Sequence, residues 1–530
     1  MPNRSLLLVF ALCTVPALVW AGESSAPTCA SLRKLALPNV TINVAERVAA
    51  GAFVPPDLKP DEKVPPLYRK TPAFCRVSAT LKPTADSDIK VEIWMPASGW
   101  NGRFRGLGNG GFAGYIAYRG LASAVTQGYA AASTDTGHST EGAEWALGHA
   151  EKFVDYGYRA IHETAVDAKS VVKAFYGDAP KQSYFSSCSN GGRQALMEAQ
   201  RYPEDYDGII AGAPANNWAP MLTSGLKVVQ TLDRNGYIPA AKIPAVSKAV
   251  LAACDAQDGL KDGLLNDPRQ CHFDPSTMLC KGKDSNECLT KAQSESLKVI
   301  YAGLRDATGK QLFPGLLPGA EEGDGGWKLW ITGSEKGKSL AGSFVIGYFA
   351  DMVYGDKDWD FRKANTESSL KLAYEKTGDT MDATNPDLKA FLGHGGKLIL
   401  YHGWNDPAIS AENSVNYYNS VVAAVGGPAE PGVRLYMVAG MQHCGGGPGA
   451  TSFGQSDTFE RADAQHDIFA ALVEWVEQGK APAAIIATRE GDPAKTAPMS
   501  RPICPYPQAP KYNGTGDPNQ ASSFVCSEGK

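Results

Sequence analysis

The sequence has little excess charge of either sign and no repeated or low-complexity stretch. Its 51 Lys and Arg residues nearly balance 56 Asp and Glu residues, which gives a formal net charge of -5 and a pI near 6.0. Because acidic residues outnumber basic ones, nothing in the composition points to a nucleic acid or an anionic membrane as a partner. The lack of internal repeats argues against a repeat architecture.

The cysteines contain no Cys-x-x-Cys pair, which argues against a cysteine metal site or free core thiols. Cys13 lies in an N-terminal apolar run, and its removal leaves ten of the 11 cysteines. An even number in an exported chain favours disulfide bonds. Local spacing favours two pairs and leaves the other partners open: Cys254 with Cys271, and Cys280 with Cys288.

The apolar run near the N-terminus is too short for a typical membrane span. Arg4 precedes the mostly apolar stretch 6–19. Small residues then stand at the positions expected before a signal-peptide cleavage site ahead of Gly22. This pattern predicts a secretory signal at residues 1–21, with a membrane anchor as the alternative. We therefore expect the mature protein to be secreted or periplasmic.

The length of 530 residues exceeds one ordinary domain, while 43% hydrophobic and 20% charged residues are typical of a globular chain with a sizeable core. We expect an α/β domain that carries a large insertion.

The stretch around Ser189 has the pattern of a strand, a tight turn and a helix. β-prone residues lead to Cys188, small residues follow, and residues 194–200 are good helix formers. This order is typical of a nucleophile elbow, which exposes a serine hydroxyl above the edge of a sheet. Gly191 fits the pattern, but Ser187 stands where a glycine is usual. Taken alone, this stretch is better explained as a turn without chemistry.

Two later segments add the partners of a catalytic triad. Asp406 follows a predicted strand at 397–401, and His443 follows another at 433–438. Serine, acid and histidine in this chain order are typical of the α/β-hydrolase fold. Asp135 and His138 also follow a strand, but they precede Ser189, so we interpret them as buried structural groups.

The glycine-rich loop at 108–112 lacks the Lys-Ser/Thr sequence of a phosphate-binding loop. Its early position in the sheet suits one donor of an oxyanion hole, and the amide of Asn190 would be the other. A loop whose glycines serve only tight turns is an equally good explanation for any single glycine.

Asp255, Asp258 and Asp262 lie within eight residues of one another. Such a carboxylate set could bind a hard cation, because close carboxylates repel one another without a counter-ion. The glycine spacing excludes an EF-hand, and a solvated acidic turn is the alternative.

The segments around the three triad residues resemble those of a known family. Cys188-Ser189, Asp406 and His443-Cys444 match the CS-D-HC arrangement of the tannase and feruloyl esterase family, and the resemblance extends from about residue 29 to residue 526. It implies an α/β-hydrolase fold with a large lid, a serine mechanism on esters of aromatic acids, and no organic cofactor.

The resemblance also implies further roles. It assigns the second oxyanion donor to Gly111. It favours a structural Ca²⁺ held by the side chains of Asp255, Asp258 and Asp262 and the carbonyls of Leu260 and Leu264. It adds three disulfides to the two suggested by spacing: Cys29 with Cys75, Cys188 with Cys444, and Cys504 with Cys526.

The gap of 217 residues between Ser189 and Asp406 is too long for one strand–helix unit. We therefore expect a catalytic domain at 22–215 and 387–530, with a lid at 216–386.

Aromatic residues in this lid could hold a substrate ring. Local similarity to the family's mono(2-hydroxyethyl) terephthalate hydrolase selects Trp330 and Tyr348, whereas Phe344 stands where that enzyme has a carboxylate-binding arginine. We expect feruloyl- or galloyl-type esters to be preferred over the terephthalate monoester. Terephthalate monoester hydrolysis, a peptidase and an inactive binding protein stay as alternatives, although all three triad residues are present.

Overall fold

The computed structural model describes residues 1, 28–56, 58–59, 61–426, 432–455, 463–491 and 497–528. The predicted signal peptide at 1–21 lies outside the described residues, apart from Met1. None of the helices within these ranges has the length and apolar character needed to cross a membrane.

A nine-stranded sheet forms the centre of the described structure. The strands in spatial order are β1 (Val40–Val48), β2 (Phe74–Leu81), β3 (Ile89–Pro96), β5 (Ala130–Thr134), β4 (Arg103–Leu107), β6 (Gln182–Cys188), β7 (Gly208–Gly212), β10 (Lys397–Gly403) and β11 (Val433–Val438). The first four strands pair antiparallel, and the pairs from β5 to β11 are parallel. This mixed, mostly parallel sheet with helices on both faces is an α/β-hydrolase fold.

Helices cover both faces of the sheet, which explains why its central strands are almost continuously apolar. One hydrophobic core lies between the sheet and α4 (Ala160–Tyr176), α5 (Asn190–Arg201) and α14 (Ala411–Val425). A second core lies between the other face and α2 (Tyr118–Thr126) and α15 (Ile468–Gln478). Apolar residues at helical spacing in the sequence predict helices at 160–176 and 464–478. α4 spans the first of these ranges, while α15 begins later than predicted, at Ile468.

The sequence analysis did not predict the two antiparallel strands β1 and β2. β1 lies at the edge of the sheet, so many of its side chains are exposed and its apolar alternation is weak. Its register also shifts between Ile42 and Val44, which interrupts the period of two.

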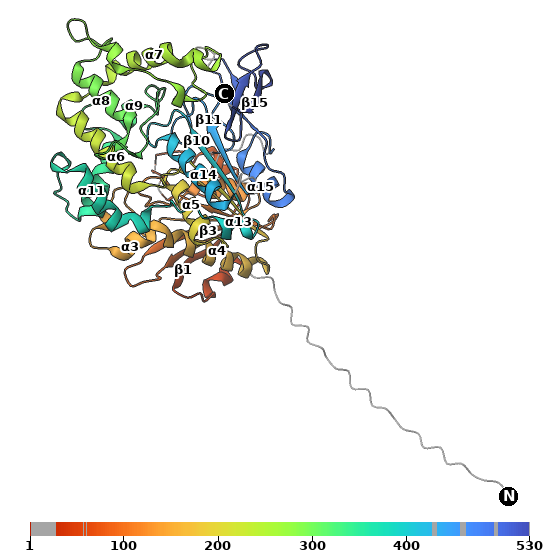
Figure 1. Cartoon of the computed structure of the whole chain (residues 1–530). Helices are drawn as coiled ribbons and strands as arrows, with labels where there is room; N and C mark the ends of the chain where they lie inside the picture. The colour runs from red at the N-terminus through yellow and green to blue at the C-terminus, as the bar shows by residue number, and fades with distance from the viewer. Residues whose placement is uncertain are drawn as a thin grey trace.

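A large insertion separates β7 from β10, in the region where the sequence predicts a lid (Figure 1). Its main helices are α6 (Trp218–Thr231), α7 (Ile243–Cys254), α8 (Lys291–Ala302), α9 (Trp327–Trp330), α10 (Leu340–Gly347) and α11 (Thr366–Ala373). Figure 1 shows these elements gathered on one side of the molecule. The chain ends with two hairpins, β12 (Ile485–Arg489) with β13 (Met499–Ile503), and β14 (Gln508–Tyr512) with β15 (Phe524–Glu528).

Five disulfide bonds connect ten cysteines within the described ranges. They are Cys29–Cys75, Cys188–Cys444, Cys254–Cys271, Cys280–Cys288 and Cys504–Cys526, the same pairs that spacing and resemblance predict. Disulfide bonds in this number fit an oxidising compartment outside the cytoplasm.

Candidate active site

Ser189 occupies the sharp turn between β6 and α5. Its backbone has φ 66° and ψ -125°, which is strained for a residue with a side chain. A side chain at Gly191 would lie 1.9 Å from the hydroxyl oxygen of Ser187, and one at Gly108 would lie 2.8 Å from its Cβ. Ser187 therefore fits where a glycine is usual because glycines stand at both positions facing it.

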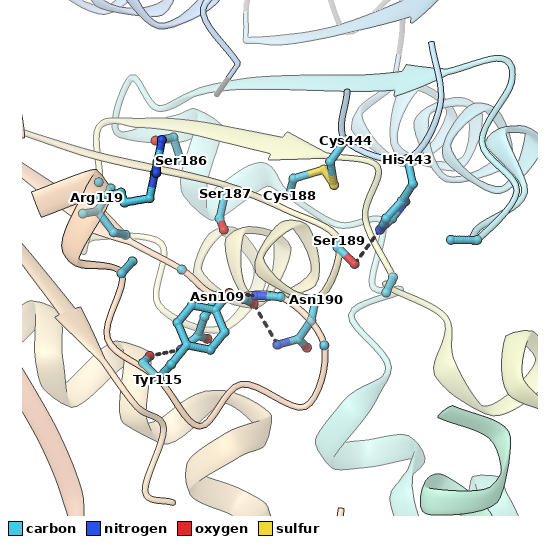
Figure 2. A pocket seen from close by; sticks show the side chains of 18 of the residues that line it. Asn109, Tyr115, Arg119, Ser186, Ser187, Cys188, Ser189, Asn190, His443 and Cys444 are labelled. Carbon is cyan, nitrogen blue, oxygen red and sulfur yellow. Dashed lines mark hydrogen bonds between the residues drawn. A yellow bond between two sulfur atoms is a disulfide. The ribbon is translucent and has the colours of Figure 1, made fainter. Parts of the chain in front are cut away.

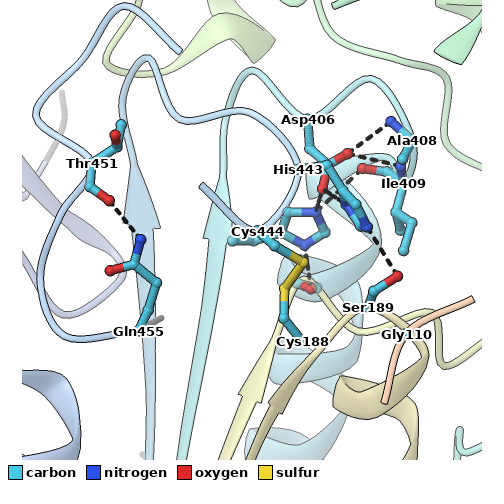
Figure 3. The surroundings of a disulfide bond; sticks show 12 residues. Gly110, Cys188, Ser189, Asp406, Ala408, Ile409, His443, Cys444, Thr451 and Gln455 are labelled. Carbon is cyan, nitrogen blue, oxygen red and sulfur yellow. Dashed lines mark hydrogen bonds and ion pairs between the residues drawn. A yellow bond between two sulfur atoms is a disulfide. The ribbon is translucent and has the colours of Figure 1, made fainter. Parts of the chain in front are cut away.

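Ser189, His443 and Asp406 form a hydrogen-bonded triad (Figure 3). The Ser189 hydroxyl donates to Nε2 of His443 at 2.9 Å, and Nδ1 of His443 donates to Oδ2 of Asp406 at 2.7 Å. Both distances are in the range that proton transfer requires. The three residues come from the carboxyl ends of β6, β10 and β11, which parallel pairing places at the same edge of the sheet.

Asp406 is fully buried and has four hydrogen-bond donors around it. Its Oδ1 accepts from the amides of Ala408 and Ile409, and its Oδ2 accepts from His443 and from Nε2 of His402. Burial alone would raise the pKa of Asp406, but the charge of His443 and the hydrogen bonds from both histidines outweigh it and hold the pKa below its ordinary value. Asp406 is thus kept ionised, as its role beside His443 demands.

The sequence analysis missed His402. It lies on β10, is fully buried, and its Nδ1 accepts from the hydroxyl of Ser414 at 2.7 Å while its Nε2 donates to Asp406 at 3.0 Å. His402 therefore fixes the carboxylate that orients His443. A buried histidine four residues before the triad acid was the available signal, but an apolar strand gives no indication of where that ring points.

The Cys188–Cys444 bond joins the residue before the nucleophile to the residue after the catalytic histidine. Figure 3 shows this bond beside the triad. Since β6 and β11 are not adjacent in the sheet, the bond holds together two loops that backbone pairing does not connect.

The two residues predicted to supply oxyanion donors, Asn190 and Gly111, line the pocket that contains Ser189. Asn190 is the first residue of α5, so its amide lies where helix geometry leaves N–H groups unpaired. Gly111 has φ 59° and lines the pocket beside it. The role of these two amides as oxyanion donors stays a prediction.

A buried polar network, which no sequence pattern indicated, holds the glycine-rich loop 108–112 in place. We call this segment the oxyanion loop. The Tyr156 hydroxyl lies 2.9 Å from the carbonyl of Gly111 and 3.2 Å from Oδ1 of Asn190. The Asn190 amide group donates to the carbonyl of Asn109, and Arg193 donates to Oδ1 of Asn190. The side chains of Tyr156 and Arg193 are fully buried. Their hydrogen bonds therefore connect the oxyanion loop to the first turn of α5 within the protein interior.

A pocket of about 940 Å³ opens at the triad (Figure 2). Trp330 and Phe344, two of the three residues predicted to bind substrate, line it on the lid side, and their contact with substrate stays a prediction. The Trp330 ring meets the His443 ring edge-on at 5.0 Å, and it lies nearly parallel to Phe344 with centroids 6.2 Å apart. At that distance the two rings contact each other. They form a wall rather than an open clamp, and a substrate ring would pack against this wall.

The prediction for Tyr348 needs correction. Tyr348 is fully buried, does not line the pocket, and packs edge-on against Trp218 and Phe349. Its hydroxyl bonds to Thr377 at 2.6 Å. The helix widens from an α-helix into a π-helix at Tyr348, and this ring packs in the lid core.

Asp135 and His138 are buried structural groups. Oδ1 of Asp135 accepts from the amides of Lys90 and Gly137, and the His138 ring bonds to the carbonyl of Phe112 at 2.6 Å. Burial raises the pKa of Asp135 to about 7 despite the hydrogen bonds from those two amides. Neither residue contacts the triad.

The acidic loop of the lid holds its carboxylates mainly with its own backbone. Asp255 accepts from Gly263, Asp258 accepts from Leu260 and Asn266, and Asp262 accepts from Leu264 and pairs with Arg501 at 2.9 Å. Burial, followed by the charges of neighbouring carboxylates, raises the pKa of Asp255 and of Asp258. Oxygen donors whose ionised forms disfavour one another suit a hard cation.

The spacing of these carboxylates is wider than that of a closed cage. Among the described residues, the three loop carboxylates do not form a group whose ligand atoms all lie within 4.8 Å of one another. The donor chemistry of the loop thus fits calcium, and its side chains would have to draw together to bind it.

Residues 75–527 match the family model described as "Tannase and feruloyl esterase". The chain is 40% identical to an uncharacterized esterase of Xanthomonas campestris pv. campestris, covering 99% of this chain and 95% of that protein. It is 32% identical to a probable feruloyl esterase B of Aspergillus clavatus, covering 94% and 95% of the two chains.

The fold agrees with solved structures. A crystal structure of feruloyl esterase B from Aspergillus oryzae superposes with a TM-score of 0.86 at 28% identity, covering 94% of this chain and 99% of that one. Tannin acyl hydrolase from Aspergillus niger, at 24% identity and a TM-score of 0.73, shares the fold. With the triad, the disulfide beside it and the family match over most of its length, the chain belongs to the tannase and feruloyl esterase family of carboxylic ester hydrolases.

Proposed function

We propose that this protein is an exported serine esterase that hydrolyses esters of phenolic aromatic acids, of the hydroxycinnamic or gallic type. The observation that carries the proposal is the position of the Trp330 and Phe344 wall, which adjoins His443 and the oxyanion loop. A substrate ring on this wall would place its ester group near Ser189. The probable feruloyl esterases among the relatives support the same substrate class.

The geometry supports a two-step mechanism through an acyl-enzyme. His443 takes the proton of Ser189 as the hydroxyl oxygen attacks the ester carbonyl, and Asp406 stabilises the charged imidazole. The amides of Asn190 and Gly111 stabilise the oxyanion. His443 then protonates the leaving alcohol, and a water molecule activated by the same ring hydrolyses the acyl-serine.

The lid side of the pocket also favours a neutral acyl ring. Phe344 lies in the wall. The two lysines nearest to it in the sequence, Lys336 and Lys338, do not line the pocket. A terephthalate monoester would bring a carboxylate to this apolar wall, and burying an unpaired charge costs several kcal/mol. Apolar contact with a neutral ring contributes about 1 to 3 kcal/mol.

The test is a comparison of kcat/KM for methyl ferulate, methyl gallate and mono(2-hydroxyethyl) terephthalate. We expect the two phenolic esters to be preferred, and Phe344→Arg to narrow the difference by supplying a partner for the carboxylate. A wild-type preference for the terephthalate monoester would contradict the proposal. Cleavage of peptides without cleavage of these esters would favour a peptidase.

Calcium in the acidic loop is a second part of the proposal. Asp255, Asp258 and Asp262 would hold the ion with the carbonyls of Leu260 and Leu264, and the ion would neutralise the clustered carboxylates. It would stabilise the lid and take no part in the reaction. Export, to the periplasm or beyond the cell, is supported by the signal-like N-terminus and the disulfide bonds.

A further inference from the structure

The pocket continues beyond the triad, on the side away from the lid wall. Its lining there includes Leu58 and Glu62 from the N-terminal segment, and Tyr118 and Arg119 from the start of α2. Figure 2 shows Arg119 and His443 at opposite ends of the view, with Ser187 and Cys188 between them. We call the part lined by Leu58, Glu62, Tyr118 and Arg119 the far lobe.

We propose that the far lobe binds the alcohol part of the substrate, and that Arg119 there recognises a carboxylate carried by that alcohol. The inference rests on the proposed function, because it assumes that the aromatic acyl group occupies the lid wall. With the ring on Trp330 and Phe344 and the carbonyl at Ser189, the leaving alcohol has to extend into the remaining part of the pocket. A volume of about 940 Å³ is far more than one aromatic acid needs.

Arg119 is the charged group of this lining that is free to bind a ligand. The structure shows no hydrogen bond or ion pair from its guanidinium to another residue of the described ranges, and the first turn of α2 contains no acidic residue. Arg105, by contrast, is buried and donates to the hydroxyl of Ser186 at 2.8 Å and 3.2 Å.

The other charged lining groups are already engaged. His443 belongs to the triad, and Glu62 pairs with Lys59 at 3.7 Å in an exposed position. Glu62 would repel an anion that came close to it, so the alcohol carboxylate has to lie on the Arg119 side of the lobe. A planar guanidinium binds a carboxylate through two parallel hydrogen bonds, which selects both the charge and its orientation.

The two ends of the pocket therefore make opposite demands on charge. A carboxylate on the acyl ring meets Phe344, whereas a carboxylate on the alcohol meets Arg119. The substrate class that satisfies both ends is an ester between a neutral phenolic acid and a hydroxy acid, of which a caffeoylquinate is an example.

The experiment compares three esters with the same acyl group: caffeoylquinate, its methyl ester at the quinate carboxylate, and methyl caffeate. We expect the wild-type protein to favour caffeoylquinate over its methyl ester by about three- to tenfold in kcat/KM, since partly exposed charge pairs contribute modestly. Arg119→Gln should remove this ratio without changing kcat/KM for methyl caffeate, and Arg119→Lys should keep part of it. Added salt should lower the wild-type ratio.

Arg47→Gln is the matched control, because Arg47 is exposed on β1 and does not line the pocket. It should leave the ratio unchanged. Turnover of methyl caffeate with no preference for the free quinate carboxylate, or a preference that survives in Arg119→Gln, overturns this inference alone. Failure to hydrolyse all three esters overturns the proposed function, and the inference falls with it.

Discussion

The catalytic centre and the acidic loop of the lid differ in how their polar groups are held. In the centre, His443 bonds to Asp406, 37 residues away in the sequence, and to Ser189, 254 residues away. In the loop, Asp255 and Asp258 bond to amides a few residues away. Long-range bonds define a preorganised site without any ligand, whereas short-range bonds are compatible with a plain acidic turn. Five experiments test whether the two sites differ in this way.

The largest effect is expected from removal of the nucleophile. Ser189→Ala should lower kcat for an aromatic ester by on the order of 10⁴- to 10⁶-fold, because the residues of a triad act as a unit. The circular dichroism spectrum should stay unchanged. Ser170→Ala, an exposed serine on α4, is the control and should behave as wild type. Substantial activity in a folded Ser189→Ala protein would place the nucleophile elsewhere.

The second experiment removes the bond beside the triad. The double variant Cys188→Ala, Cys444→Ala should lose roughly a hundredfold in kcat, because a shift of about 1 Å in the reacting groups is enough for such a loss. The loop-entropy model gives roughly 5 kcal/mol as an upper limit for its effect on stability.

The matched control for this bond is Cys280→Ala, Cys288→Ala, which removes a lid bond of short sequence separation. It should keep nearly full activity. Equal activity in the two double variants would show that the Cys188–Cys444 bond does not position the triad.

The third experiment tests the network beneath the oxyanion loop. Tyr156→Phe leaves the carbonyl of Gly111 without its 2.9 Å partner. An unsatisfied buried group costs about 1 to 3 kcal/mol, so we expect kcat to fall about tenfold with little change in KM. Tyr176→Phe removes a similar hydroxyl, bonded to the carbonyl of Pro96 outside the site, and should leave kcat unchanged. A parallel fall in both variants would indicate a general loss of packing.

The fourth experiment addresses the loop directly. Exhaustive chelation should lower the Tm, and Ca²⁺ but not Mg²⁺ should restore it, because magnesium tolerates irregular oxygen cages poorly. Asp258→Asn should reduce the response, while Asp274→Asn, on an exposed lid turn, should not. A Tm that is insensitive to chelation, in protein shown to be free of metal by elemental analysis, would leave the loop as a plain acidic turn.

The smallest effect on activity is expected for Asp135, where the change is in stability; burial raises the pKa of this carboxyl from 3.8 to about 7. Because the folded state holds this proton more tightly than the unfolded state, the contribution of Asp135 to stability is complete below pH 3.8 and is lost as the pH rises through about 7. Asp135→Asn should remove that decline in stability, which amounts to at most about 4 kcal/mol. The measurement is the free energy of unfolding of both proteins from pH 4 to 8. An unchanged pH dependence would show that the carboxyl titrates normally.

Much of this protein could be predicted from the sequence because the signals are local. The elbow at Ser189 needs only a strand, small residues and a helix in succession, and the triad order follows from an acid and a histidine that each end a strand. The limits of α4 follow from apolar spacing. The edge strand β1 was missed because its exposed side chains break the alternation on which that kind of prediction depends.

The direction of each side chain, by contrast, depends on how segments that are distant in the sequence pack against one another. His402 lies in an apolar strand, yet its Nδ1 accepts from the hydroxyl of Ser414 on α14. Tyr156 lies in a helical segment, and its hydroxyl donates to the carbonyl of Gly111. Tyr348 turns into the lid core, while Arg119 lines the pocket. A sequence pattern specifies which residues share an element, but contacts between elements far apart in the chain determine which of their polar atoms meet.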